Sequence, residues 1–248
     1  MESNFNPFSL QDKTILVTGA SSGIGQGIAL LCSKMGATVV INGRNDARLQ
    51  KTLSQMDGKD HIVAQGDLSD FASLPGLVSK MPKLDGVVHC AGIGSRVLCK
   101  MMQESDLDQT MTINFKAPVM LQTELLKQKK VNKNGSIVFI ASMAQDSPSI
   151  GNALYAASKS AIVSYAQCLQ LELAPRLIRV NCISPAMVWT DLIFKGGITE
   201  EQLQEDEKKY PLKRYGRPED IANLAVYLLS DASSWMGGSN VKITGGAH

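Results

Sequence analysis

Short runs of β-branched and other apolar residues recur along the chain, and longer segments between them repeat apolar residues every three to four positions. The runs that predict strands are TILVT (14–18), TVVIN (38–42), HIVAQ (61–65), GVVHC (86–90), SIVFI (136–140), IRVNCI (178–183) and NVKIT (240–244). Helices are expected over 27–35 and 46–56, around 103–128 and around 154–174. Strands that alternate with amphipathic helices indicate βαβ units, and nearly continuous apolar strands indicate a sheet covered on both faces.

This alternation predicts an α/β protein with one doubly wound domain over residues 1–248 and a mostly parallel seven-stranded sheet with helices on both faces. Residues 1–11 precede the first strand as an N-terminal extension. The segment 186–215 follows the sixth strand at the carboxyl edge of the sheet, where we expect a substrate lid. Its charged run EEQLQEDEKK favours a solvated helix face. The apolar side chains expected to form a wall of this lid are Trp189, Leu192, Ile193 and Phe194.

The composition narrows the class of protein. Of the 248 residues 44% are apolar and 19% are charged, as in globular proteins, and a net charge of +2 is too small to indicate a nucleic-acid or membrane-surface protein. The N-terminus does not resemble a secretory signal, and no apolar run is long enough to span a membrane. Five cysteines without a CxxC pair indicate reduced thiols and a cytoplasmic location. Three histidines without ligand spacing predict no metal site.

The first strand ends in TGASSGIG (18–25), which places Gly19, Gly23 and Gly25 at a strand-to-helix turn. Glycines there allow a tight turn and a close approach of the backbone to a pyrophosphate, which then rests on the helix N-terminus. A turn required only for packing is the alternative. The position on the first strand of an alternating sheet favours nucleotide binding.

The second strand ends in VVINGRND, with Gly43 where dinucleotide folds usually carry an acid, and with Arg44 next to it. An acid there binds the ribose 2′-hydroxyl, whereas an arginine accommodates a 2′-phosphate. The sequence therefore favours NADP(H). The alternative is an ordinary turn with a solvated Arg44.

The stretch YAASK (155–159) places Tyr155 and Lys159 four residues apart, on one face of a helix, with small residues between them. On their own these five residues favour a simpler interpretation, a half-buried tyrosine beside a lysine whose ammonium reaches solvent. In a reaction site, the small residues would leave room for a ligand. The ammonium would then stabilise a phenolate.

From about residue 12 to the C-terminus the chain resembles the short-chain dehydrogenase/reductase family. TGASSGIG resembles the family's cofactor turn, and GDLSD (66–70) resembles the stretch whose Asp67 would contact adenine. Further matching motifs are CAG (90–92), TINFKAP with Asn114, IASMA with Ser142, YAASK, and GRPEDIANLAVYLLSD (216–231). The resemblance implies a Rossmann-like fold and a nicotinamide-dependent oxidoreductase, with 3-oxoacyl-acyl-carrier-protein reductases as the members most similar in pattern.

The resemblance assigns a reacting set of Asn114, Ser142, Tyr155 and Lys159. Tyr155 would exchange a proton with the substrate, Ser142 would donate to its carbonyl, Lys159 would also hold the nicotinamide ribose, and Asn114 would join a proton relay. The residues implied in cofactor binding are Gly19, Ser21, Ser22, Gly23, Ile24, Gly25, Arg44, Asp67, Leu68, Cys90, Ala91, Gly92, Asn114, Tyr155, Lys159, Pro185, Val188 and Thr190.

Four positions depart from the family pattern. His89 and Cys90 stand where the family has two asparagines, and we interpret His89 as structural rather than catalytic. Ala186 stands where glycine is usual, which would destabilise the chain by about 1 kcal/mol if the position needs a positive φ. Thr244 stands where an aspartate is common.

These features predict an NADP(H)-dependent reductase or dehydrogenase acting on a carbonyl or secondary alcohol, with 3-oxoacyl thioesters as the leading substrates. Sugar, polyol or steroid-like alcohols are alternatives, as is a cofactor-binding regulator without activity. The resemblance also implies a homotetramer. The basic stretch KQKKVNK (127–133) and Arg176 are either a solvated helix end or a docking patch for an acidic acyl carrier protein.

Overall fold

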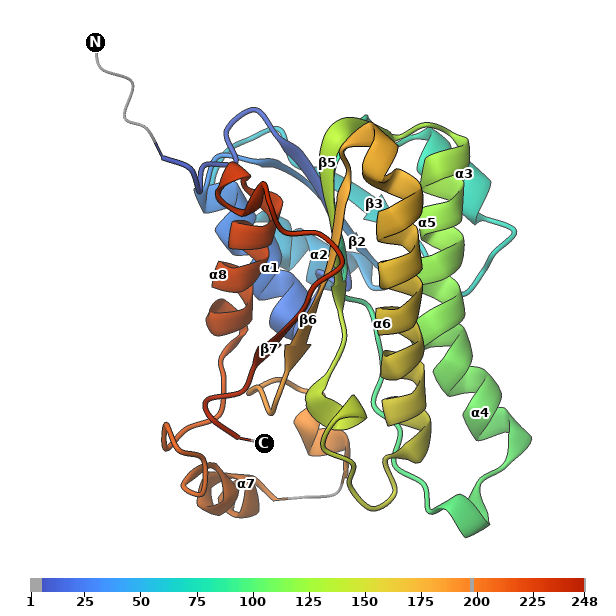
Figure 1. Ribbon diagram of the computed structural model, residues 1–248, viewed down its shortest axis with the longest axis vertical. Coiled ribbons are helices and arrows are strands. Elements are labelled where there is room, and N and C mark those ends of the chain that lie inside the picture. Colours follow the sequence, from blue (N-terminus) through green and yellow to red (C-terminus); the bar gives the residue numbers. More distant parts are fainter. Residues whose placement is uncertain (1–5, 197–198, 248) are drawn as a thin grey trace.

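The computed structural model describes residues 6–196 and 199–247. Residues 1–5 of the predicted N-terminal extension, residues 197–198 of the predicted lid and the terminal His248 lie outside the described residues. In the described part, seven strands form one sheet in the order β3-β2-β1-β4-β5-β6-β7, and every neighbouring pair is parallel (Figure 1). The predicted fold class is confirmed.

All seven predicted strands are present, with ends that differ by a few residues. They are β1 (Thr14–Thr18), β2 (Thr38–Gly43), β3 (Ile62–Gln65), β4 (Leu84–His89), β5 (Val131–Ile140), β6 (Arg179–Pro185) and β7 (Asn240–Ile243). The largest difference is in β5, which starts before the predicted run. Val131 pairs with Leu84, and an irregularity in register separates that pair from Ser136 opposite Gly86. Asn134, with φ of 63°, lies within this irregular stretch.

Helices cover both faces of the sheet (Figure 1). They are α1 (Gly23–Lys34), α2 (Asp46–Leu53), α3 (Leu74–Ser79), α4 (Glu104–Met111), α5 (Ala117–Lys127), α6 (Ala153–Leu173), α7 (Glu200–Glu207) and α8 (Pro218–Leu229). Helices α1 and α8 pack on one face, whereas α5 and α6 pack on the other. Helix α7 lies beyond the carboxyl ends of the strands. No helix among the described residues is long and apolar enough to cross a membrane.

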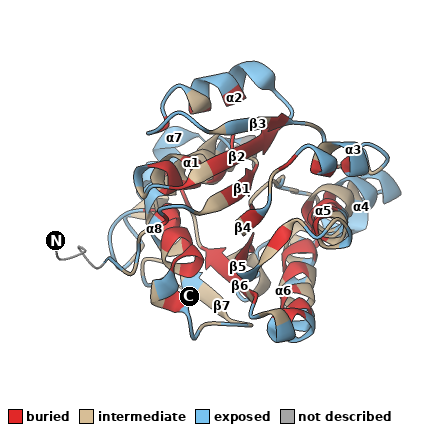
Figure 2. Cartoon of the chain, turned by 90° about the horizontal axis from the view of Figure 1, so that it is seen from above, coloured by how far each residue is buried: buried red, intermediate tan, exposed pale blue. Residues whose placement is uncertain are grey.

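The two faces of the sheet carry separate apolar cores, which explains the nearly continuous apolar strands. Ile15 and Val17 contribute to the core under α1 and α8, while Leu16 between them contributes to the core under α3, α5 and α6. All three side chains are fully buried. Figure 2 shows the same buried stripe along the centre of the sheet, with exposed residues on the outer helix faces. Alternate residues of one strand therefore serve opposite cores.

The predicted helix around 103–128 is divided into α4, a π-helical turn at Thr112–Lys116, and α5. Asn114 lies in the middle of the π turn and is 1% exposed. A π turn widens the helix by one residue and is frequent at functional sites. The interruption places a buried polar side chain between α6 and the turn after β4.

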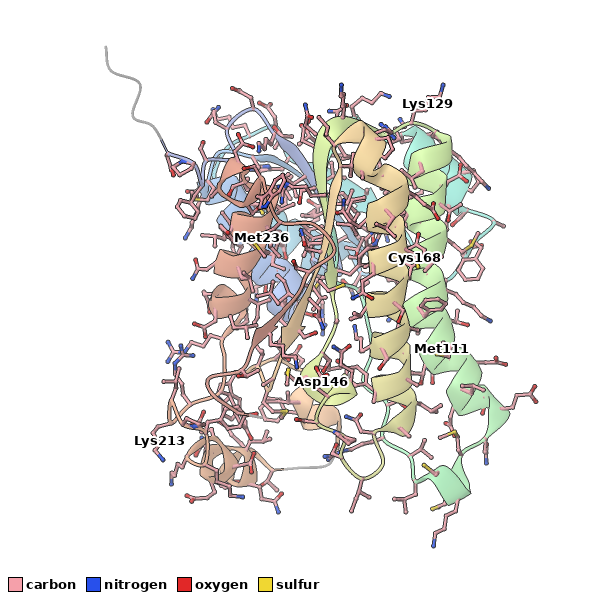
Figure 3. The ribbon with its side chains drawn as sticks, viewed as in Figure 1. Met111, Lys129, Asp146, Cys168, Lys213 and Met236 are labelled. Atoms are coloured by element: carbon pink, nitrogen blue, oxygen red, sulfur yellow. The ribbon has the colours of Figure 1, made fainter. Side chains whose placement is uncertain are left out.

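The basic stretch 127–133 is not a simple helix end. Lys127 closes α5, but Val131–Lys133 already belong to β5. Lys130 donates to the carbonyl of Ser79 at 2.9 Å, and Arg176 donates to the carbonyl of Val131. Figure 3 shows Lys129 at the end of the molecule opposite Asp146, which follows β5 at its carboxyl edge. Two of the predicted patch cations therefore bind backbone carbonyls at the amino edge of the sheet.

His89 at the end of β4 is a buried structural residue, in agreement with its interpretation from the sequence. Its ring stacks on Phe139 with centroids 4.5 Å apart, and its Nε2 lies 3.0 Å from Oε1 of Gln122 on α5. Burial lowers the pKa of His89 to about 4, and the hydrogen bond with Gln122 opposes this shift only in part. The imidazole is therefore neutral in the folded protein.

The lowered pKa of His89 predicts a pH dependence of stability. The unfolded chain takes up a proton near the ordinary histidine pKa of 6.5, but the folded chain does so only near 4, so stability is full above pH 6.5 and is lost as pH falls. The free energy of unfolding in urea should decrease by about 2 kcal/mol between about pH 7 and pH 5. In the His89→Asn variant the slope should flatten over this range. An unchanged slope would show that another group is responsible.

Candidate active site

A cleft of about 840 Å³ opens at the carboxyl edge of the sheet, around the point between β1 and β4 where the strand order changes direction. Open α/β sheets bind ligands there, because the connections on either side of this point leave toward opposite faces. Asn114 is the one predicted site residue that does not line the cleft. The others do: Gly19, Ser21, Ser22, Gly23, Ile24, Gly25, Arg44, Asp67, Leu68, Cys90, Ala91, Gly92, Ser142, Tyr155, Lys159, Pro185, Val188 and Thr190.

The turn after β1 is compact because three of its positions lack a side chain. Gly19 and Gly23 have φ angles of 67° and 54°, in the left-handed region. A Cβ on Gly25 would lie 2.3 Å from the carbonyl oxygen of Gly19, and a Cβ on Gly19 would lie 2.9 Å from Cα of Ala91. The turn therefore folds tightly against the start of α1 and against the neighbouring turn after β4.

The start of α1 fits a dinucleotide phosphate. Gly23, Ile24 and Gly25 line the cleft, and the N-cap residue Ser22 makes no side-chain hydrogen bond to the first turn. The amides of a first helical turn have no partner within the helix, and the helix dipole favours an anion beside them. With glycines that leave room for the backbone to approach, these residues fit a pyrophosphate.

Arg44 and Asp67 mark the end of the cleft that β2 and β3 form. Nη1 of Arg44 lies 3.8 Å from Oδ2 of Asp67, and the two side chains are 68% and 46% exposed. Hydrogen bonds from the hydroxyl and amide of Ser69, and then the charge of Arg44, hold the pKa of Asp67 below its ordinary value. Such an exposed ion pair is weak, so Arg44 remains available to another anion.

A buried threonine fixes the turn after β4. Thr18 Oγ1 accepts hydrogen bonds from the amides of Cys90 and Ala91, at 3.0 and 3.1 Å. Cys90 lines the cleft, but burial raises the pKa of its thiol to about 12 against the opposing charge of Lys159. Cys90 is therefore a protonated thiol of low reactivity.

Tyr155 and Lys159 lie one turn apart on α6, and both line the cleft. Lys159 is 5% exposed, and its ammonium donates to the carbonyl of Ile140 at 2.8 Å. Its Nζ lies 5.7 Å from the centroid of the Tyr155 ring. Ser142 follows β5 and accepts a hydrogen bond from the amide of Ala144 at 3.1 Å. A hydroxyl, a phenol and a held cation thus meet at one part of the cleft.

Asn114 lies behind these groups and holds them in place. Its amide side chain accepts from the amide of Ile93 at 2.8 Å and donates to the carbonyl of Ile93 at 2.9 Å. It also donates to Oγ of Ser158 at 3.1 Å, and Ser158 donates to the carbonyl of Tyr155 at 2.7 Å. Asn114 therefore joins the loop after β4 to the helix that carries Tyr155.

Comparison with known proteins identifies the family. A family model described as enoyl-(acyl carrier protein) reductase matches residues 19–248. A 3-oxoacyl-acyl-carrier-protein reductase of Rickettsia felis is 37% identical over 237 residues, which cover 96% of this chain and 97% of that protein. The chain belongs to the short-chain dehydrogenase/reductase family. It is therefore an oxidoreductase of alcohol or carbonyl groups that uses a nicotinamide cofactor.

Other members of the family are named for other substrates. An NAD-dependent glycerol dehydrogenase of Listeria innocua is 34% identical over 244 residues, covering 96% of this chain and 95% of that protein. The solved structure of a glucose/ribitol short-chain dehydrogenase/reductase from Brucella melitensis has a TM-score of 0.90 at 29% identity, covering 97% and 98% of the two chains. The family is thus clear, whereas its members include both acyl and polyol enzymes.

The departures from the family pattern leave this geometry intact. Ala186 is absent from the described residues with positive φ, and its amide donates to the carbonyl of Ile243 at 3.0 Å. The condition for strain at this position is therefore not met. Thr244 accepts from the amide of Gly246 at 3.2 Å and so supports the turn that follows β7.

The predicted lid segment is held together by aromatic and acidic side chains of its own. Trp189 donates from Nε1 to Oε2 of Glu207 at 2.8 Å, and the hydroxyl of Tyr215 donates to Oδ2 of Asp206 at 2.6 Å. The hydrogen bond from Tyr215 lowers the pKa of Asp206. The charged run is mostly exposed but buries Leu203. Helix α7 is thereby joined to residues near both ends of the lid segment.

Several lining residues carried no signal in the sequence, because they lie on loops or, in the case of Arg48, on helix α2 rather than at strand ends. The polar ones include Arg48, Ser95, Arg96, Ser149, Asn152 and Tyr210. Asn152 is the one of these that the sequence could most readily have indicated, because it lies directly before the first turn of α6. The others come together only through the tertiary fold.

The close contact at Gly25 predicts a large effect from one methyl group. Gly25→Ala should force the turn to shift, lower stability by about 1–3 kcal/mol, and abolish measurable cofactor binding. Gly76→Ala on α3 is the matched control, because a Cβ there meets nothing within 4 Å; it should be neutral or stabilise by up to about 1 kcal/mol. Thermal unfolding and cofactor titration measure both effects. Equal behaviour of the two variants would contradict this interpretation of the turn.

Proposed function

We propose that this protein is an NADP(H)-dependent reductase that transfers a hydride between nicotinamide and a carbonyl or secondary alcohol. The observation that carries the proposal is the arrangement of Ser142, Tyr155 and Lys159 at one part of the cleft, with Asn114 joined to Tyr155 through Ser158. A regulator that only bound the cofactor would not need this reacting set. Catalysis is therefore the favoured function.

In the proposed mechanism a bound NADPH supplies the hydride. Tyr155 donates its phenolic proton to the carbonyl oxygen, and Ser142 donates a hydrogen bond to the same oxygen as negative charge develops. Lys159 stabilises the phenolate that remains, because its ammonium is held near the ring by the carbonyl of Ile140. Asn114 maintains the position of Tyr155. In the oxidative direction Tyr155 accepts the proton instead.

Three features of the β2 end support a preference for NADP(H). Position 43 lacks an acid that would repel a 2′-phosphate, and Arg44 and Arg48 both line this end of the cleft. Ser21 lies near Gly43, because a Cβ built on Gly43 would lie 3.5 Å from the hydroxyl oxygen of Ser21. A guanidinium binds phosphate with two parallel hydrogen bonds. We propose that Arg44 gives this contact.

For the substrate, 3-oxoacyl thioesters are the leading proposal, because Met143, Leu192 and Ile193 offer an apolar wall and the Rickettsia relative is named for this reaction. Polyols or sugars are the second proposal. Ser149 and Asn152 at the same end of the cleft could bind hydroxyl groups, and the Listeria relative is named a glycerol dehydrogenase. We also propose that residues 186–215 act as the substrate lid.

A carrier-linked substrate would meet a geometric constraint. The basic stretch 127–133 lies at the amino edge of the sheet, whereas Tyr155 lies in the first turn of helix α6 at the carboxyl edge. The 21 residues of this helix span about 30 Å at 1.5 Å per residue, and the two places are separated by about this length. An acyl carrier protein docked there would have to serve the cleft of another subunit. The homotetramer inferred from the family would provide such a second subunit. The proposed docking of a carrier protein therefore depends on the proposed homotetramer. A cytoplasmic location stays a prediction.

The proton donor is tested by Tyr155→Phe. This variant should lower kcat by about 10²–10⁴-fold on the best carbonyl substrate found in a panel of 3-oxoacyl thioesters, diketones and sugars. NADPH affinity should change only a few-fold, because the phenol is not its main contact. Tyr227→Phe on α8, away from the cleft, is the control. Near-normal kcat in Tyr155→Phe would refute the mechanism.

Cofactor choice is tested by Arg44→Ala. The wild-type protein should bind NADPH at least about tenfold more tightly than NADH, a difference of about 1.4 kcal/mol. The variant should lose that preference and keep its NADH affinity, since the ion pair with Asp67 contributes little. Lys51→Ala removes a charge from the exposed face of α2 and should change neither affinity. Fluorescence titration measures all six affinities, and an equal loss for both cofactors in Arg44→Ala would disprove the assignment.

A further inference from the structure

Arg96 lines the cleft at the end away from the proposed cofactor phosphates. It belongs to the loop that leaves the turn after β4, four residues beyond Gly92. Arg44, Arg48 and Asp67 lie at the β2 and β3 end, on the other side of the switch point. The cleft therefore has arginines at both ends.

Two contacts fix the place of the Arg96 loop. The amide of Val97 donates to the carbonyl of Gly151 at 2.8 Å, in the loop that leads into α6. On the other side, a Cβ on Gly94 would lie 3.5 Å from Cδ1 of Leu192 in the predicted lid. Arg96 thus stands between the loop that precedes Tyr155 and the lid, beside the proposed reacting groups.

The guanidinium of Arg96 makes no hydrogen bond or ion pair with a side chain or carbonyl among the described residues. Arg44, Arg176, Arg179 and Arg214 all do, to carboxylates, carbonyls or hydroxyls. The other cleft arginine without such a partner is Arg48, which lies where we propose the 2′-phosphate. A cation in a cleft with no internal partner is suited to an anion from the ligand.

The cofactor does not account for Arg96. Its pyrophosphate is expected at the start of α1, and its 2′-phosphate is expected beside Arg44. Asp191 is the acid of the lid that lines the cleft, and it forms no ion pair with Arg96 within 4.0 Å. The partner of Arg96 is therefore to be sought on the substrate.

We propose that Arg96 binds a carboxylate or phosphate group carried by the carbonyl substrate, and so determines the substrate class as anionic. This inference rests on the reductase function proposed above. Ser95, Ser149 and Asn152 line the same end and can donate to the remaining oxygen atoms of such a group. The guanidinium fork matches either anion with two parallel hydrogen bonds.

The test compares carbonyl compounds in pairs, of which one member carries the anionic group and the other is neutral. The carboxylate arm uses 3-oxobutanoate and its methyl ester, and the phosphate arm uses dihydroxyacetone phosphate and dihydroxyacetone. NADPH oxidation gives kcat and KM for the wild type, Arg96→Gln and Arg96→Lys. Asp191→Asn shows whether the nearby acid opposes anion binding. Lys80→Gln removes one positive charge from the exposed residue that follows α3, away from the cleft, and controls for net charge.

In at least one arm the wild type should prefer the anionic member by about tenfold or more in kcat/KM, mainly through KM. Arg96→Gln should lose this preference without change on the neutral member, Arg96→Lys should keep part of it, and Lys80→Gln should keep all of it. The arm that responds identifies the anion. If Arg96→Gln has the same preference in kcat/KM as the wild type in every pair of compounds, this inference fails while the reductase function stands. If the wild type reduces no member of either pair and no compound of the wider panel, both fail.

Discussion

The contact between the turns after β1 and β4 is the constraint on which the site depends. These strands are neighbours in the sheet, but the chain leaves them toward opposite sides, and a cleft opens where it does so. Thr18 closes the base of that cleft by accepting from the amides of Cys90 and Ala91. Gly19 permits the approach, because any side chain there would meet Ala91. A wider separation of the two turns would separate the start of α1 from Lys159, and the cofactor half of the site from the reacting half.

A buried cation is the second requirement of this arrangement. An ammonium removed from water is unfavourable by several kcal/mol unless hydrogen bonds replace the lost solvent. For Lys159 the carbonyl at the end of β5 supplies one such bond. The π turn at Thr112–Lys116 brings Asn114 against Ser158, next to Lys159 in sequence, so the helix that carries the cation is fixed from a second side. The irregular helix is thus part of the site rather than a defect in packing.

The sequence predicted the sheet, its order of elements and most of the cleft, because residues at strand ends are placed by the fold itself. The glycine turn directly follows strand β1 and Ser142 lies just after β5, so their positions do not depend on the conformation of the longer loops. The early start of β5 could not be predicted, since Asn132–Gly135 do not look like a strand and join it only through the pairing of Val131 with Leu84. The hydrogen bond from Lys130 to the carbonyl of Ser79 could not be predicted either, because the two residues are distant in sequence. Whether Ala186 is strained could not be decided from the sequence, because the answer depends on φ, which is not positive there.

The two halves of the cleft differ in how much of their chemistry the backbone determines. In the cofactor half, glycine conformation and helix amides form the site, so a short motif is enough to recognise it. In the other half, side chains from three separate loops meet, at Arg96, Asn152 and Leu192, and each can change without disturbing the sheet. Family membership therefore determines the class of reaction but leaves the substrate open. The charge on Arg96 is the feature of this half most readily matched to a ligand, because an unpaired guanidinium selects for charge and not only for shape.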